Sequence, residues 1–131
     1  MTLPSSIDRP FALRVAKDIV DLDPLLASLP RSLAAHKLST LRDLAEELAL
    51  QSEALRLEVL LDRPIQEHCD TSQVIVLLLR RLQDLARRSR VAPLTMATLQ
   101  LSLRLADKIH KNLALWVDAQ GDELELSLAL H

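Results

Sequence analysis

The chain has 131 residues, is 49% hydrophobic and 26% charged, and carries a formal net charge of −2, which predicts a single folded domain over residues 1–131 and excludes wholesale disorder. Its single cysteine excludes an internal disulfide, its single glycine excludes a glycine-rich phosphate loop, and its longest apolar run is far shorter than the ~20 residues of a membrane span. We therefore expect a cytoplasmic protein that has no cofactor, no metal ion and no membrane partner.

Leucine dominates the composition, whereas tyrosine is absent and phenylalanine and tryptophan occur once each. Leucine and alanine favour helices, and a sheet would need more β-branched and aromatic residues and more glycine turns. The composition therefore predicts an all-α fold. We expect an antiparallel bundle of three long helices preceded by a broken N-terminal helical segment.

The N-terminal third is predicted to be helical but interrupted by prolines. Residues 1–9 are expected to be a loose lead-in, and Pro10 suits the first helical position, where a missing N–H costs nothing. Apolar residues then recur at helical spacing from Phe11, although the first of them also alternate as in a strand. Pro24 and Pro30 are expected to break this segment into short helices.

A second helix is expected from a cap at Thr40 to about Asp62, because Pro64 bars its continuation. One face carries an apolar stripe of Leu41, Leu44, Leu48, Leu55 and Val59. A second stripe consists of Leu50, Leu57 and Leu61. Two apolar stripes predict a helix that packs on two sides.

Residues 63–69 are interpreted as a connector, and Asp70 as the cap of a third helix that ends near Arg90. The first half of this helix is apolar all round, because the run 74–79 covers every direction of a 3.6-residue turn. A fourth helix is expected to begin at Pro93. Its apolar seam follows a strict three–four spacing through Met96, Leu99, Leu103, Ala106, His110, Leu113 and Val117.

Gly121 sits where a left-handed helix cap belongs, so residues 122–131 are interpreted as a C-terminal arm. Four leucines alternate there with other residues, at Leu124, Leu126, Leu128 and Leu130. This alternation is typical of a strand. The arm is therefore expected to be extended on a protein surface, with a terminal helical turn as the alternative.

Charge is unevenly distributed along the chain. Residues 71–111 carry eight basic and two acidic side chains, whereas the segments on either side are acidic. Helical spacing places the basic residues on shared faces of the third and fourth helices, at Arg80, Arg81, Arg87, Arg88, Arg104, Lys108 and Lys111. Such a patch could hold phosphates, but we favour a face that is solvated or paired with acidic residues.

Other candidate chemistry is sparse. His68 and Cys69 are adjacent, but a closed zinc site needs about four ligands, so we interpret them as part of a polar connector. His110 lies on the apolar seam, where a buried neutral histidine with one partner is expected. The residues around His36 loosely resemble the phosphorylated histidine of histidine phosphotransfer domains, but that family's glycine is absent here, so we assign no such family.

These observations favour a small helical protein–protein interaction module, an adaptor, chaperone-like binder or regulator that is not an enzyme. The chain has more apolar faces than one bundle can bury, so we expect a homodimer or a helical protein partner. The interface candidates are the start of the third helix and the tail, at Val74, Ile75, Val76, Leu79, Leu124, Leu126, Leu128 and Leu130. The alternatives are a nucleic-acid-associated protein that uses the basic patch and, less favoured, a phosphotransfer module at His36.

Overall fold

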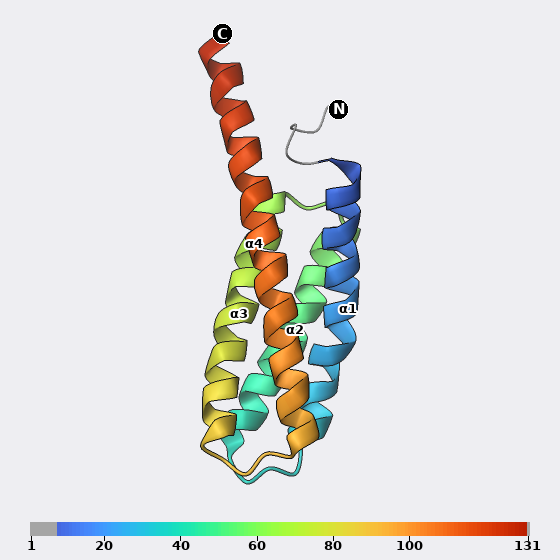
Figure 1. The fold of residues 1–131 in the computed structure, drawn as a ribbon, viewed down its shortest axis with the longest axis vertical. Coiled ribbons are helices and arrows are strands. Elements are labelled where there is room, and N and C mark those ends of the chain that lie inside the picture. Colours follow the sequence, from blue (N-terminus) through green and yellow to red (C-terminus); the bar gives the residue numbers. More distant parts are fainter. Residues whose placement is uncertain (1–7, 131) are drawn as a thin grey trace.

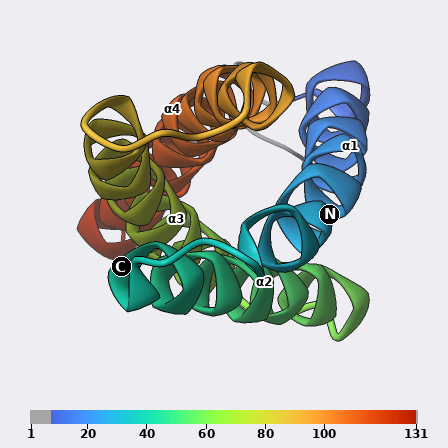
Figure 2. The same cartoon turned by 90° about the horizontal axis from the view of Figure 1, so that it is seen from below.

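The computed structural model describes the backbone of residues 8–130 and the side chains of residues 8–119, and within these bounds the chain is all-helical without a strand. The helices are α1 (Arg9–Leu33), α2 (Ser39–Leu60), α3 (Ile65–Arg87) and α4 (Pro93–Leu130). Their connecting loops lie alternately at the two ends of the molecule (Figure 1). Both α1 and α3 pack against α2 and α4, so the four helices surround one core (Figure 2). The prediction of an all-α fold is confirmed.

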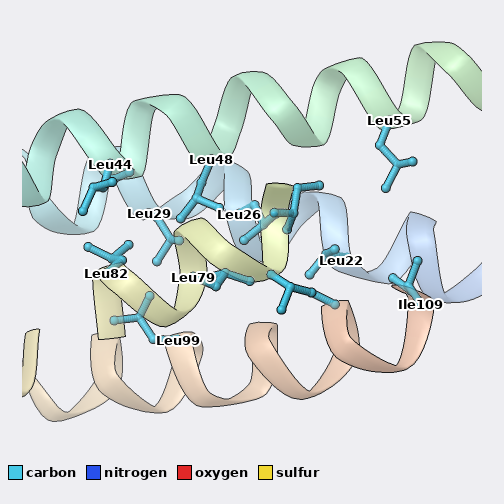
Figure 3. Packing of buried hydrophobic residues seen from close by; sticks show 14 of the residues in the cluster. Leu22, Leu26, Leu29, Leu44, Leu48, Leu55, Leu79, Leu82, Leu99 and Ile109 are labelled. Carbon is cyan, nitrogen blue, oxygen red and sulfur yellow. The ribbon is translucent and has the colours of Figure 1, made fainter. Parts of the chain in front are cut away.

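Leucine fills most of this core. Each helix turns one apolar stripe toward the other three, and side chains from all four helices meet between the ribbons (Figure 3). The largest fully buried side chains are Leu22, Leu26, Leu29, Leu41, Leu48, Leu55, Ile75, Leu79, Leu82, Leu99 and Ile109. Burying one such side chain contributes about 1.5–3 kcal/mol, so the shared core explains why these four amphipathic segments fold together.

The N-terminal segment is one helix rather than several short ones, so the prediction of a broken segment was wrong. Asp8 caps α1 by accepting a hydrogen bond from the Phe11 N–H at 2.9 Å. Pro24 and Pro30 lie inside the helix. Buried leucines lie on both sides of each proline, and their packing keeps the backbone helical although each proline removes one hydrogen bond.

Residues 65–69 of the predicted connector 63–69 are also helical. α3 begins at Ile65, directly after Pro64, and not at an Asp70 cap. Ile65, His68 and Ser72 continue the buried face of the helix toward its N-terminus, and spacings of three and four residues explain why these first turns form. α2 begins at Ser39, with Leu38 at the N-cap and no side-chain cap, so the predicted cap at Thr40 was wrong by two residues.

The predicted start of α4 at Pro93 is confirmed. The helix continues through Gly121 to Leu130, so the left-handed cap and the extended arm were both wrong. The tail is rich in leucine and glutamate, which are strong helix formers, and has no β-branched residue. No strand among residues 8–130 offers an edge to pair with. The tail leucines that were proposed as interface candidates have side chains outside the described residues.

No helix in the described part of the chain is long and apolar enough to cross a membrane.

Candidate functional site

The second apolar stripe of α2 faces solvent. Leu50, Leu57 and Leu61 are 61%, 44% and 70% exposed, whereas the first stripe is in the core. With Ala54 between them, these residues follow the spacing of four, three and four that is typical of a helix–helix seam. We name Leu50, Ala54, Leu57 and Leu61 the α2 seam. It is an apolar strip that the bundle leaves uncovered.

The apolar run at the start of α3 is divided between core and surface. Ile75, Val76 and Leu79 are 0–4% exposed and belong to the core, so these three interface candidates are corrected to core residues. Val74 and Leu77 are 40% and 55% exposed. A single turn of helix must present some side of a continuous apolar run to solvent, and these two residues occupy that side. Leu77 was not among the interface candidates.

Polar contacts hold α2 against α3. The Thr71 hydroxyl donates to Glu58 Oε1 over 2.7 Å, and His68 Nδ1 lies 3.5 Å from Glu58 Oε2. His68 is buried, at 6% exposure. The carboxylate of Glu58 therefore accepts one hydrogen bond from the neighbouring helix and lies close to His68, although Glu58 Oε2 and His68 Nδ1 have no hydrogen-bond partner among residues 8–119.

A second polar contact joins α3 to α4. The Ser72 hydroxyl donates to the Cys69 carbonyl over 2.7 Å, and the same oxygen lies 3.0 Å from His110 Nδ1. Because the hydroxyl has one proton, His110 must donate from Nδ1 if both bonds form. Cys69 Sγ lies 4.0 Å from this nitrogen. Burial, and to a smaller extent the charges of Asp70 and Asp118, raise the pKa of the Cys69 thiol.

The basic residues divide between two faces of α4. Lys108 reaches Asp18 on α1, 3.2 Å away. Asp107 is 3.6 Å from Arg80 and 2.9 Å from Lys111. Part of the predicted patch is therefore paired with acidic residues of the same chain.

Three arginines of the predicted patch meet at one cleft between α3 and α4. Its lining consists of Arg80, Gln83, Arg87, Gln100, Leu103, Arg104 and Asp107, and its volume is about 500 Å³. Arg81 is not in this lining, and Arg88 lines another hollow beside the α1–α2 loop. The two glutamines were missed at the sequence level, although Gln83 lies three residues after Arg80 and Gln100 four residues before Arg104.

His36 lies in the loop between α1 and α2, where its Nδ1 accepts the Leu38 N–H over 3.1 Å. In the described part of the chain, no three histidine, cysteine or acidic side chains gather to hold a metal ion. Comparisons with protein-family models, curated proteins and solved structures find no match to this chain. The candidate functional surfaces are therefore the α2 seam, the exposed side of α3 and the arginine cleft.

Proposed function

We propose that this chain is a self-associating helical protein–protein interaction module, an antiparallel bundle that pairs with a second copy through the outer faces of α2 and α3. The α2 seam carries this proposal. Three leucines at helix-packing spacing, each 44–70% exposed, form an apolar strip of the kind that marks an interaction site.

The register between α2 and α3 supports a symmetric pair. Glu58 contacts His68 and Thr71. In helices of opposite direction, Leu50, about two turns before Glu58, comes level with Leu77, about two turns after those residues. A two-fold axis parallel to the helices would lay α2 of each copy on α3 of the other. Leu50 would then face Leu77 of the second copy, and such isologous contacts are the commonest arrangement in dimers.

Charge favours the same arrangement. The exposed residues Glu46, Glu47 and Glu53 flank the α2 seam, whereas Arg81 is exposed on the outer side of α3. Glu47 lies about three turns before Glu58, and Arg81 about three turns after His68 and Thr71. The two-fold axis would therefore bring Glu47 opposite Arg81 of the second copy. By contrast, pairing α2 with α2 would oppose glutamates to glutamates.

The available area is of the size that a stable dimer needs. α2 and α3 have 22 and 23 residues, so each is roughly 33 Å long and ~10 Å wide. Side by side they offer a face of roughly 700 Å², close to the ~800 Å² that each partner contributes to a standard interface.

Sedimentation equilibrium at micromolar concentration tests this proposal. The wild type should have about twice the chain mass of 14.7 kDa. Leu50→Glu should be monomeric with its helical circular dichroism intact, because Leu50 is outside the core. Val20→Glu is the matched control, since Val20 is 66% exposed on α1, and it should remain dimeric. A monomeric wild type, or equal disruption by both variants, would overturn the proposal.

A further inference from the structure

We propose that the arginine cleft between α3 and α4 binds the phosphate groups of a small ligand that carries a diphosphate or triphosphate chain. This inference is independent of self-association, because the α2 seam is not part of the cleft. It rests on the charge balance of the cleft, on its length and on the amide of Gln83 in its lining.

The cleft has more cationic than anionic groups. Arg80, Arg87 and Arg104 line it together with the single carboxylate of Asp107. That carboxylate is also shared with Lys111, from which it lies 2.9 Å away. Within residues 8–119, no carboxylate lies within ion-pair distance of Arg87 or Arg104. These two guanidiniums therefore keep their donor groups free for an anion, and their planar forks suit phosphate oxygens.

Gln83 adds a neutral polar group to the lining of the cleft. Most of the residue is buried, at 9% exposure, but within residues 8–119 its amide atoms are not among the buried polar atoms that lack a partner. It lines the cleft between the two ends marked by Arg80 and Arg87. The amide therefore reaches the solvent of the cleft, where a ligand oxygen would accept its N–H.

The shape of the cleft favours a phosphate chain over a single phosphate. Arg80 and Arg87 are seven residues apart, so about 10 Å of helix separates them. Linked phosphates can contact both ends without either arginine bending toward the other. The volume of about 500 Å³ lies within the usual range for small-molecule sites.

The surroundings favour a small ligand over nucleic acid. Lys108 is drawn toward Asp18 on α1, and Arg88 lines a separate hollow, so the basic residues do not form one continuous track. The two aromatic rings of the chain, Phe11 and Trp116, pack against each other with 6.2 Å between centroids and do not line the cleft. Stacking platforms for unpaired bases are therefore missing from this part of the structure.

Isothermal titration calorimetry with sodium tripolyphosphate, pyrophosphate and orthophosphate tests the proposal on the full chain. Affinity should fall in that order. Arg87→Gln and Arg104→Gln should each weaken tripolyphosphate binding at least tenfold, and Gln83→Leu should weaken it several-fold without changing the charge. Arg88→Gln is the matched control, because it removes the same charge from the neighbouring position outside the cleft, and it should bind like the wild type.

Three results would overturn the proposal. One is the absence of tripolyphosphate binding below 1 mM at low ionic strength, a threshold on the order of the weakest specific affinities. Another is an equal loss of affinity in Arg88→Gln and Arg87→Gln, which would indicate general charge attraction. The third is duplex DNA binding that is tighter than tripolyphosphate binding and equally weakened by Arg88→Gln, which would indicate a nucleic-acid surface. The variant Leu50→Glu, which should be monomeric, should bind tripolyphosphate as tightly as the wild type. If the proposed dimer does not form, the test of phosphate binding is therefore unaffected.

Discussion

Thr71 on α3 donates a hydrogen bond to Glu58 on α2, with 2.7 Å between the hydroxyl and carboxylate oxygens. Glu58 is also the residue that His68 approaches, so both residues of α3 meet α2 at this side chain. The proposed pairing depends on this register between α2 and α3, because the register places Leu50 and Leu77 at the same position along the bundle axis. The contact thus links the inner packing of the bundle to its outer surface.

Thr71→Val should lower the free energy of unfolding by about 1–2 kcal/mol, because Glu58 Oε1 loses its donor in a partly buried place. Urea denaturation followed by circular dichroism measures this change. Thr98→Val is the control, since the Thr98 hydroxyl donates only to the Leu94 carbonyl of its own helix. If both variants lose equal stability, the contact between the helices has no special role.

Ser72→Ala should destabilise the chain by about 1–3 kcal/mol. Ser72 is 1% exposed, and its hydroxyl is the group that lies between the Cys69 carbonyl and His110 Nδ1. Removal of the hydroxyl leaves the Cys69 carbonyl and His110 Nδ1 with one hydrogen-bond partner fewer in a poorly hydrated part of the bundle. Thermal unfolding measures the effect, and an unchanged midpoint would show that water replaces the hydroxyl without cost.

Cys69 should react slowly with thiol reagents in the folded protein. Burial and nearby carboxylates raise the pKa of its thiol above the ordinary value of 9.0. The folded state thus favours the protonated thiol. The stability that the protonated thiol contributes is complete below the pKa of the thiol in the unfolded chain, and it is lost as the pH rises through the pKa of the thiol in the folded protein. Reaction with a thiol reagent at pH 8 should be much slower than in urea, and stability should decline above about pH 9. Equal rates in both states would contradict the buried thiol.

Pro24→Ala should stabilise the protein. Pro24 is exposed within α1, so the substitution removes no core packing and restores one backbone N–H. A helix-interior proline costs about 3 kcal/mol relative to alanine, and part of this is offset because proline also restricts the unfolded chain. We expect a gain of about 1 kcal/mol or more by urea denaturation. A loss of stability would show that α1 is already adapted to the proline.

Composition predicted the all-α class, and periodicity predicted the α4 seam and the two stripes of α2, because burial of a repeating apolar face determines where such stripes occur. It failed where local signals conflicted with tertiary packing. Pro24 and Pro30 are local helix breakers, yet the leucines around them are buried in the core, where α1 packs against α2 and α4. The tail alternates as a strand would, yet its residues prefer helix, and residues 8–130 contain no strand whose edge it could pair with.

The candidate surfaces were less accessible to prediction. The spacing of the arginines indicated a shared face, but only the packing of α3 on α4 separates Arg80, Arg87 and Arg104 from Arg81 and Arg88. Likewise the run 74–79 contained no sign of which residues face outward. Leu77 becomes a candidate only once the neighbours of α3 are known.

Charge reversal at the proposed dimer interface tests directly whether α2 pairs with α3 of a second copy. Glu47→Arg and Arg81→Glu should each be monomeric by sedimentation equilibrium, because each opposes like charges at both symmetric contacts. Mixed in equal amounts, the two variants should form a heterodimer, since each altered charge then faces its complement. The double variant should dimerise alone. If both single variants remain dimeric, or if their mixture stays monomeric, the pairing of α2 with α3 is contradicted.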